Sequence, residues 1–273
     1  MKDGAIDVLV RIAAEAAKLV AEVYATPFVV DFKGPSDPVT EADRRANDHI
    51  VERLTREFPG VPIVAEESEP GTFANFAASS EIFFVDPVDG TNEFVERNPE
   101  FVVMIGLLSG EVPTLGVMHA PALGVAWAGE VGRGAERVLA DGTRSPIRVS
   151  DTPELSSARL VSSRSHRSAR LDRALAAIGP REVYTKGSAG LKGTEVAEGA
   201  ADAHVAPFYA GKRWDACAAE ALIRAAGGRV TDAYGDPLDY RGAGLSNDRG
   251  LVATNGRIHD AILQKLAAHR GIA

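Results

Sequence analysis

The stretch Phe84-Val85-Asp86-Pro87-Val88-Asp89-Gly90-Thr91 ends a hydrophobic segment with two aspartates and a Gly-Thr turn. Proline fixes its own φ angle and keeps the preceding residue extended, so we expect Asp86 at the end of a strand. Carboxylates on a rigid support, with backbone N–H groups nearby, suit a divalent metal ion and a phosphate group. An ordinary turn is an equal alternative for this stretch alone, because Asp-Pro and Asp-Gly pairs occur in many loops.

The segments around this stretch predict an antiparallel sheet packed against two long helices. Apolar residues recur at a helical period over residues 5–24, and Thr40 opens a second helix that runs to about Phe58. A loop containing Gly34 and Pro35 separates these two helices. Strand-like runs joined by Gly- or Pro-bearing turns follow the helices, at residues 61–65, 82–85, 101–108, 113–120 and 124–129.

After about residue 150, strand-like and helical segments alternate, which predicts an α/β arrangement. The predicted strands are residues 159–162, 183–184, 203–206, 229–231 and 251–254, and the predicted helices are residues 168–178, 191–198, 216–226 and a last one from residue 258. We therefore predict two sub-domains, an α+β unit over residues 1–150 and an α/β unit over residues 151–273. No repeat at a fixed period is evident.

The composition indicates an ordinary soluble globular protein. The 273 residues are 45% hydrophobic and 25% charged, and the net charge of −8 argues against a nucleic-acid polymer as partner. One cysteine excludes an internal disulfide, and no apolar run reaches the ~20 residues of a membrane span. Charged residues within the first predicted helix argue against a signal peptide, so we expect a cytoplasmic location without membrane association. They are Asp7, Arg11 and Glu15.

Acidic residues recur at the ends of predicted strands and at the starts of predicted helices. Glu66-Glu67 and the Asp86–Asp89 pair follow strands, whereas Asp43 and Asp215 lie in the first turns of helices. Helix capping alone explains Asp43 and Asp215, and a solvated loop explains Glu66-Glu67. Strand ends are nevertheless where α/β proteins build their sites, so the recurrence favours a metal centre.

Taken together, these segments resemble the ordered motifs of the inositol monophosphatase superfamily. The motifs are Asp37-Pro38-Val39-Thr40-Glu41-Ala42-Asp43, Ala65-Glu66-Glu67-Ser68, Asp86-Pro87-Val88-Asp89-Gly90-Thr91, Trp214-Asp215-Ala216-Cys217-Ala218-Ala219 and Ala226-Gly227-Gly228. They span most of the chain in the family's order. The resemblance implies an α+β or α/β fold, layered as an αβαβα sandwich of the inositol monophosphatase and sugar phosphatase type. It also implies Mg²⁺-dependent, lithium-sensitive hydrolysis of a phosphomonoester.

Carried over residue by residue, the resemblance implies a site for two or three Mg²⁺ ions. The implied ligands are Glu66, Asp86, the carbonyl group of Val88, Asp89 and Asp215. The implied catalytic residues are Glu66 together with Asp43 and Thr91, a pair that orients and deprotonates the attacking water. Backbone N–H groups of Gly90 and Thr91 would hold the phosphate. Ala65 departs from the family, in which glycine commonly precedes the paired glutamates, and this change leaves the ligands intact.

The sequence Asn92-Glu93-Phe94 resembles the bacterial 3′(2′),5′-bisphosphate nucleotidase branch more than the inositol phosphatases. Segments 163–166, 187–192 and 212–215 resemble the same branch. This implies that the enzyme removes the 3′-phosphate of adenosine 3′,5′-bisphosphate, giving AMP, in sulfur metabolism. The implied nucleotide contacts are His166, Ser188, Lys192 and Arg213, with Lys192 or Arg213 near the second phosphate, since a second phosphate needs a cationic contact.

Several alternatives remain open at this point. His166 is equally well explained as a solvated loop residue, and Trp214 as a packing residue. An inositol monophosphatase, or a broad sugar phosphatase that acts on fructose 1,6-bisphosphate, is the alternative enzyme. A binding protein without activity is a different class, although every implied ligand keeps an oxygen donor. A homodimer is also left open, and the partner is expected to be a small phosphorylated metabolite.

Overall fold

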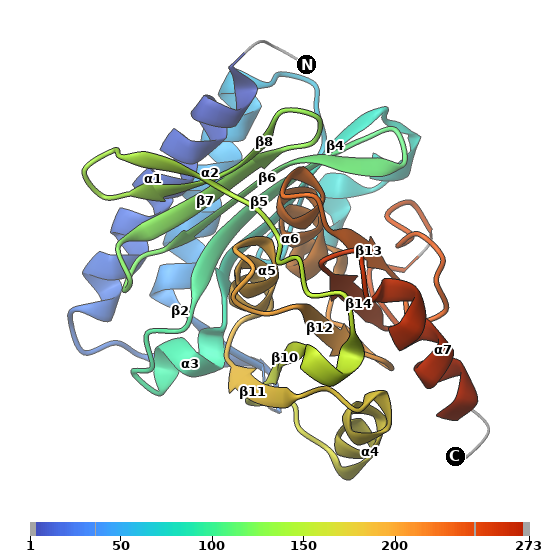
Figure 1. Cartoon of the computed structure of the whole chain (residues 1–273). Coiled ribbons are helices and arrows are strands. Elements are labelled where there is room, and N and C mark those ends of the chain that lie inside the picture. The colour runs from blue at the N-terminus through green and yellow to red at the C-terminus, as the bar shows by residue number, and fades with distance from the viewer. Residues whose placement is uncertain (1–3, 36, 243, 270–273) are drawn as a thin grey trace.

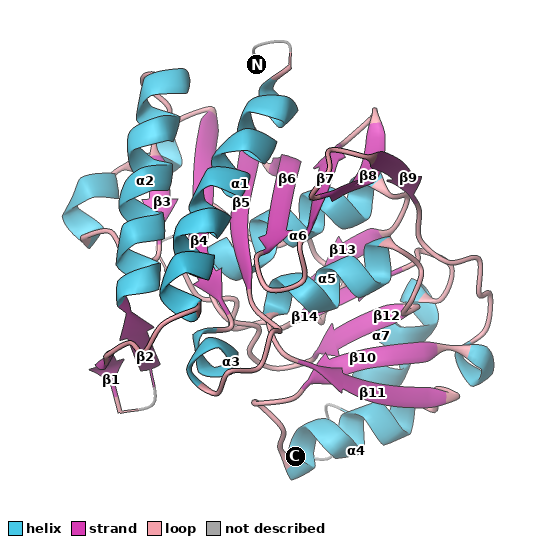
Figure 2. Ribbon diagram, turned by 90° about the vertical axis from the view of Figure 1, so that its left-hand side faces the viewer, coloured by secondary structure: helices cyan, strands magenta, loops and turns pink. Residues whose placement is uncertain are grey.

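The chain folds into five alternating layers of helices and sheets (Figures 1 and 2). The computed structural model describes residues 4–35, 37–242 and 244–269. Helices α1 (Ala5–Tyr24) and α2 (Glu41–Glu57) form the first layer, and α5 (Ala189–Ala197) and α6 (Arg213–Ala225) form the third. Helices α4 (Ala169–Ile178) and α7 (His259–His269) form the fifth layer. The layered αβαβα sandwich that the sequence predicted is confirmed.

The second layer is a seven-stranded sheet with the strand order β3-β4-β5-β6-β7-β8-β9. Its strands are β3 (Ile63–Ala65), β4 (Glu81–Asp89), β5 (Val102–Ser109), β6 (Val112–Ala120), β7 (Val125–Glu130), β8 (Gly134–Leu139) and β9 (Arg144–Ile147). Every neighbouring pair is antiparallel except β3 and β4, which are parallel. Strands β8 and β9 were not predicted, because residues 134–147 are mostly polar and exposed at the edge of the sheet.

The fourth layer is a five-stranded mixed sheet with the order β11-β10-β12-β14-β13. Its strands are β10 (Arg159–Ser163), β11 (Glu182–Lys186), β12 (Ala203–Ala206), β13 (Arg229–Thr231) and β14 (Leu251–Thr254). The parallel strands β10, β11 and β12 end together, and the loops that follow them face α3 (Thr91–Val95). The short helices η1 (Pro70–Phe73), η2 (Phe76–Ala78) and η3 (Leu155–Ser157) lie in connections.

Three hydrophobic cores hold the layers together. One lies between α1, α2 and the first sheet, the second encloses α5 and α6 between the two sheets, and the third lies under α4 and α7. Because α5 and α6 contact both sheets, the chain forms one stack through the third layer. The division into sub-domains at residue 150 stays a prediction.

A row of glycines lets α6 lie unusually close to the first sheet. Gly106, Gly116 and Gly129 stand directly opposite one another on β5, β6 and β7. A Cβ atom at Gly116 would lie 2.1 Å from the carbonyl oxygen of Ala218, and one at Gly106 would lie 2.6 Å from the Ala218 nitrogen. Any side chain in this row would therefore push α6, and with it the first turn of the helix, away from β4.

The predicted loop between the first two helices is wrong in its conformation. Residues Val30–Gly34 (β1) and Asp37–Thr40 (β2) pair as an antiparallel hairpin, and Ser36 lies outside the described residues. Helix α6 also begins three residues before the predicted start, because Asp215 accepts a hydrogen bond from the Lys212 N–H and so caps the helix. The hairpin ends at Thr40, whose N–H donates to Asp43, and α6 begins beside Asp215. Both differences therefore lie next to an acidic side chain that accepts a backbone hydrogen bond.

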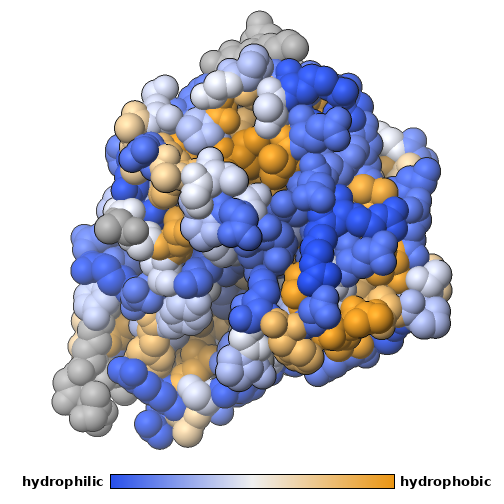
Figure 3. All heavy atoms as spheres, turned by 180° about the vertical axis from the view of Figure 1, so that it is seen from behind, coloured by the Kyte–Doolittle hydropathy of each residue, from blue (hydrophilic) through white to orange (hydrophobic). Residues whose placement is uncertain are grey.

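Figure 3 shows the back of the molecule with hydrophobic residues in separate groups among hydrophilic ones. Val29 and Phe32 are the most exposed large hydrophobic residues of the described chain, at 77% and 65%. Among the described residues, no helix has the length and apolar character to cross a membrane. The homodimer that the sequence left open stays a prediction.

Candidate active site

The two aspartates of the motif lie at the end of β4, where the strand carries an extra residue. Asp86 pairs with Met104 and Asp89 with Val102, so three steps on β4 face two steps on β5. Residues three apart on a regular strand point to opposite faces, and a bulge of this kind can bring them to one side. The Asp86 carboxylate accepts a hydrogen bond from the Val88 N–H at 3.0 Å, which fixes the bulge.

Asp215 reaches the same place from the first turn of α6. Gly211 precedes it with a φ of +69°, and a Cβ atom there would lie 2.0 Å from the Asp215 Oδ2 atom. Glycine is therefore required at position 211 by both the backbone conformation and the carboxylate beside it. The glycine row under α6 and Gly211 together bring Asp215 close to β4.

Glu66, Asp86 and Asp215 form one acidic cluster. One carboxylate oxygen from each lies within 4.8 Å of the others. Burial raises the pKa of Asp215 to about 8 and that of Glu66 to about 7, and burial with the neighbouring carboxylates raises the pKa of Asp86 well above its usual range. Three hard oxygen donors that repel one another when ionised fit a divalent cation, because the cation would compensate their charge.

Asp89 is close to this cluster but is held by the opposite half of the molecule. Its Oδ2 atom accepts hydrogen bonds from the Ser188 hydroxyl and from the Gly190 N–H at 2.6 Å. Asp89 is therefore not part of the three-residue cluster found among the described residues. Its Oδ2 atom instead ties β4 to the N-terminus of α5.

A lysine that the sequence analysis did not consider neutralises part of the cluster. Lys33 on β1 lies 2.7 Å from the Glu66 Oε1 atom and 2.6 Å from the Glu67 Oε1 atom. These two carboxylates raise the pKa of Lys33 against the effect of its burial. No local pattern pointed to this pairing, because the sequence around Lys33 predicted a loop and Glu66 lies 33 residues further along the chain.

Asp43 and Thr91 meet at the edge of the cluster, as the resemblance implied. The Thr91 hydroxyl lies 3.2 Å from the Asp43 Oδ1 atom and 3.0 Å from the Val88 carbonyl oxygen. The other Asp43 oxygen accepts hydrogen bonds from the Thr40 N–H and hydroxyl at 2.8 and 2.7 Å. Thr40 thus holds Asp43 in place, and burial raises the pKa of Asp43.

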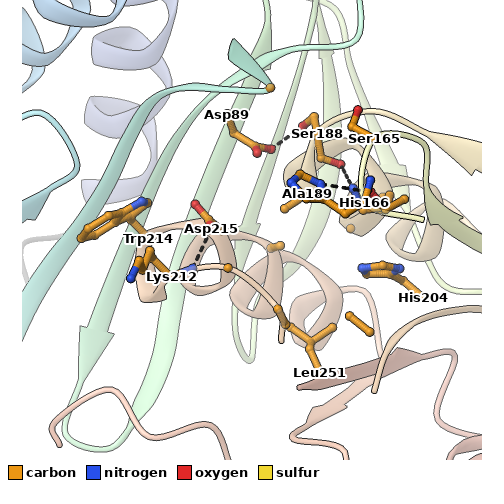
Figure 4. Close-up of a pocket in the computed structure, with 18 of the residues that line it drawn as sticks. Asp89, Ser165, His166, Ser188, Ala189, His204, Lys212, Trp214, Asp215 and Leu251 are labelled. Atoms are coloured by element: carbon orange, nitrogen blue, oxygen red, sulfur yellow. Dashed lines mark hydrogen bonds between the residues drawn. The ribbon is translucent and has the colours of Figure 1, made fainter. Parts of the chain in front are cut away.

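A cavity of about 580 Å³ extends from the acidic residues into the space between α6 and the five-stranded sheet (Figure 4). Glu66, Asp89, Thr91 and Asp215 are among the residues that line it. Figure 4 shows Asp89 and Asp215 at one end of the view and His204 and Leu251 toward the other. The volume lies within the roughly 300–1,000 Å³ that small-molecule sites occupy.

Lys192 is a buried cation in the wall of this cavity. It is 6% exposed, and within the described residues its ammonium group makes one hydrogen bond, from Nζ to the Ser188 carbonyl oxygen at 2.5 Å. Burial lowers its pKa, and the surrounding carboxylates, Asp89 first, act in the opposite direction. An ammonium group has three donors, so two of the three remain for an anion in the cavity.

Two loops after β10 and β11 complete the wall and are held by carboxylates of the first half. Glu93 accepts a hydrogen bond from the Ser165 hydroxyl at 2.5 Å, and Glu100 accepts one from the Gly187 N–H at 2.7 Å. A Cβ atom at Gly187 would lie 2.5 Å from the Glu93 Cγ atom. Ser163, Ser165, His166 and Ser188 line the cavity on these loops.

The predicted site residues come together with one exception. Gly90 lines the cavity beside Thr91, whereas Arg213 points away from it and is 2% exposed. The Arg213 guanidinium donates to the carbonyl oxygens of Tyr240 at 3.2 Å and Gly242 at 3.1 Å. The predicted contact between Arg213 and the substrate is therefore corrected: this side chain anchors the loop after β13.

The sequence analysis missed four residues of the site. Glu93 and Glu100 fix the loops, Lys33 pairs with the cluster, and His204 lines the cavity from the middle of β12. Glu93 lies directly after the motif and was noted only as part of a resemblance. A lone histidine within a strand of small residues carries no local signal, so only the packing of the layers could reveal His204.

Comparison with known proteins agrees with this geometry. The chain matches the description "Inositol monophosphatase family" over residues 1–270. It is 36% identical over 238 residues, 86% of this chain and 93% of the relative, to 3′(2′),5′-bisphosphate nucleotidase CysQ of Escherichia coli K12. It is 35% identical over 243 residues, 88% of each chain, to histidinol-phosphatase of Mycobacterium tuberculosis.

The fold is also found in solved structures. The extragenic suppressor protein suhB from Bartonella henselae superposes with a TM-score of 0.81 at 28% identity, and the match covers 97% of this chain and 98% of that one. The family match covers nearly the whole chain, and the shared layers and the acidic cluster beside β4 agree with it. The chain belongs to the inositol monophosphatase family and is a phosphatase.

Proposed function

We propose that this phosphatase hydrolyses the 3′-phosphate of adenosine 3′,5′-bisphosphate, giving AMP and phosphate, with Mg²⁺ as its cofactor. The observation that carries the proposal is that one cavity joins an acidic cluster to a buried ammonium group, Lys192. A substrate with two phosphate groups could place one at the acidic cluster and the other at Lys192. The E. coli relative, which carries the name of a bisphosphate nucleotidase, supports the same substrate.

The residues fit two or three magnesium ions by the chemistry of their donors. Glu66, Asp86, the Val88 carbonyl group, Asp89 and Asp215 would hold the ions, since all five offer hard oxygen atoms. When bound, such ions neutralise the phosphoryl oxygens, activate a water molecule and stabilise the leaving oxygen. The raised pKa values of Glu66 and Asp215 mean that cation binding would be accompanied by proton release.

The chain's own groups supply the positioning and the proton transfer. The Thr91 hydroxyl, held between Asp43 and the Val88 carbonyl oxygen, would orient the attacking water, and Asp43 would accept the proton through that hydroxyl. Backbone N–H groups of Gly90 and Thr91, at the start of α3, would bind the phosphoryl oxygens. Ser188 and His166 line the wall on which the nucleotide would rest.

The position of Lys192 favours this proposal over histidinol phosphate and inositol 1-phosphate as substrates. A second phosphate would gain a charge-assisted hydrogen bond from Lys192 in a largely water-free wall. The ammonium group of histidinol phosphate would be repelled there, although the Mycobacterium tuberculosis relative carries that enzyme's name. Inositol 1-phosphate has no second anionic group to use this cation.

A phosphate-release assay with four substrates tests the proposal. The panel is adenosine 3′,5′-bisphosphate, inositol 1-phosphate, fructose 1,6-bisphosphate and histidinol phosphate, each with saturating Mg²⁺. We expect kcat/KM to be highest for the nucleotide. A higher value for any of the other three would overturn the proposal and identify the substrate class.

A further inference from the structure

The turn that precedes α6 is fastened by one residue from a distant part of the chain. Residues 210–212 lead into the helix, and Asn247 contacts them from the segment between β13 and β14. The Asn247 N–H donates to the Gly211 carbonyl oxygen at 2.9 Å, and the Asn247 carbonyl oxygen accepts from the Ala210 N–H at 3.1 Å. Its side-chain Nδ2 atom donates to the carbonyl oxygens of Ala210 at 3.3 Å and Lys212 at 2.7 Å. Asn247 therefore binds every residue of this turn.

The same turn sets the direction of the Asp215 carboxylate. The Lys212 N–H donates to the Asp215 Oδ2 atom at 2.7 Å, and the Lys212 carbonyl oxygen accepts from the Asp215 N–H at 3.2 Å. The Gly211 carbonyl group and the Lys212 N–H belong to one planar peptide unit, so the Asn247 N–H that binds the first also orients the second. Glycine at position 211, with a φ of +69°, has many accessible backbone conformations, so contacts from outside the turn are needed to hold this one.

Asn247 acts on this turn from behind the cavity. It is 6% exposed and is not among the described residues that line the cavity, whereas Ala210, Gly211 and Lys212 are. Asn247 therefore contacts no ligand in the cavity, and any effect that it has on the reaction must pass through the turn.

Neighbouring residues keep the segment in place without the Asn247 side chain. The Leu245 carbonyl oxygen accepts from the Arg213 N–H at 2.9 Å, and the Ser246 hydroxyl accepts from the Lys212 Nζ atom at 2.8 Å. The backbone bonds of Asn247 itself also remain when its side chain is shortened. Loss of the amide group therefore loosens the turn while the segment stays next to the start of α6.

We propose that Asn247 is a positioning residue for the phosphatase reaction, because it holds the turn that directs the Asp215 carboxylate toward the acidic cluster. This inference rests on the metal site proposed above, in which Asp215 is a ligand. Residues that orient a metal ligand from outside the site commonly change metal affinity by tenfold or more. Mg²⁺ requires a nearly ideal octahedral arrangement, whereas Ca²⁺ accepts a flexible one, so a displaced Asp215 should weaken the binding of Mg²⁺ more than that of Ca²⁺.

Calorimetric titrations of Asn247→Ala with Mg²⁺ and with Ca²⁺, both without substrate, test the inference. We expect the Mg²⁺ dissociation constant to rise about tenfold over that of the wild-type protein, and the Ca²⁺ constant to rise by about two- to threefold. A lower amount of folded protein would change the number of sites and not these constants. An unchanged Mg²⁺ constant, or equal rises for the two ions, would overturn the role of Asn247.

Asn255→Ala is the matched control. Asn255 is 4% exposed, and its Nδ2 atom also donates to two oxygens, the Ser150 hydroxyl at 3.0 Å and the Thr152 carbonyl at 2.9 Å. It is not among the described residues that line the cavity. Both variants should lose a similar amount of unfolding free energy in EDTA, and only Asn247→Ala should change the affinity for Mg²⁺. An equal loss of Mg²⁺ affinity in the control would show that general destabilisation causes the effect.

Hydrogen exchange in the wild-type protein covers the case in which Asn247→Ala does not fold. Mg²⁺ should slow the exchange of the Asn247 N–H, which donates to the Gly211 carbonyl oxygen, because coupling between two sites acts in both directions. The Asn255 N–H, which donates to the Asp202 carbonyl oxygen at 2.9 Å, should slow less. Equal slowing of the two would contradict the inference. Absence of Mg²⁺ binding by the wild-type protein would instead overturn the proposed metal site, and with it this role of Asn247.

Discussion

The two ends of the cavity are built in different ways. At the acidic end, each side chain stands where an element begins or ends: Asp86 at the bulge of β4 and Asp215 in the first turn of α6. At the inner end, His204 and Ala253 come from the middle of strands. The ends of helices and strands have marked sequence patterns, because proline, glycine and capping residues occur there, whereas the middle of a buried strand contains mostly small apolar residues. The sequence therefore predicted the acidic residues at the first end, and it did not predict which residues line the second end.

The largest expected effect breaks the acidic end. Asp86→Asn should lower kcat by about a thousandfold, because a ligand whose charge stabilises the transition state is lost. The same change should stabilise the metal-free protein at pH 8, because the unfolded chain ionises Asp86 there whereas burial in the folded protein opposes that charge. Turnover and unfolding in urea with EDTA measure the two effects.

The matched control is a buried aspartate outside the cavity. Asp202 accepts hydrogen bonds from the Ser150 hydroxyl at 2.5 Å and from the Arg159 N–H at 2.6 Å. Asp202→Asn should cost about 2 kcal/mol of unfolding free energy and leave kcat per folded molecule unchanged. A loss of stability in Asp86→Asn like that in Asp202→Asn would show that Asp86 has a structural role.

The second prediction concerns the close packing of α6, which carries residues of both ends. Gly116→Ala would place a Cβ atom 2.1 Å from the Ala218 carbonyl oxygen, so the helix must move. The unfolding free energy should fall by about 3 kcal/mol. Gly71→Ala, where a Cβ atom meets nothing within 4 Å, is the control and should change it little. Equal effects of the two substitutions would mean that the glycine row does not control the position of α6.

The third prediction sharpens the boundary between the two ends. Lys192→Met keeps most of the side-chain volume and removes the charge, so kcat/KM should fall about thirtyfold for adenosine 3′,5′-bisphosphate and much less for adenosine 3′-monophosphate. Lys186→Met is the control, because Lys186 pairs with Glu195 at 2.6 Å and does not line the cavity. Equal losses on the two substrates would remove Lys192 from recognition of the second phosphate.

The smallest effect is a pH dependence of stability in the metal-free protein. Burial raises the pKa of Glu66 to about 7 and that of Asp215 to about 8. As pH rises, the unfolded chain therefore releases these protons before the folded protein does, and the free energy of unfolding falls. Three histidines act in the opposite sense, because burial lowers their pKa values and the protein loses stability as pH falls through about 6.5. They are His204 and His259, which are buried, and His119, which is partly buried.

The informative window therefore lies between about pH 7 and 8, where the histidines are mostly neutral in both states. In EDTA the melting temperature should fall by a few degrees across this window, and Mg²⁺ should remove the slope by replacing the protons. Asp215→Asn should flatten it without Mg²⁺. A melting temperature that rises with pH in EDTA would contradict the assigned burial of these carboxylates.

Most helices and central strands were predictable from the sequence. Helix α1 has the predicted bounds, and so do β12, β13 and β14, because periodicity and turn residues agree in these segments. Strands β8 and β9 were missed because neither alternates regularly between buried and exposed residues, and β9 is largely exposed at the edge of the sheet. The β1–β2 hairpin was missed because its Gly and Pro residues predict a loop just as well. Arg213 was assigned to the substrate because a sequence position beside Asp215 does not reveal the direction of a side chain.

The sequence by itself determined which acidic residues belong to the acidic end, through local patterns taken together with the family resemblance. The motif with its proline, the capping position of Asp43 and the Trp214-Asp215 pair each act through local backbone geometry, which is set by residues a few positions away. Only the tertiary structure decided the rest. The glycine row brings α6 close to the seven-stranded sheet, and the carboxylates of Glu93 and Glu100 hold loops of the five-stranded sheet. The Val161 carbonyl oxygen lies 3.0 Å from the Nδ1 atom of His204. These contacts join residues far apart in the chain, and only the packed layers bring them within hydrogen-bonding distance.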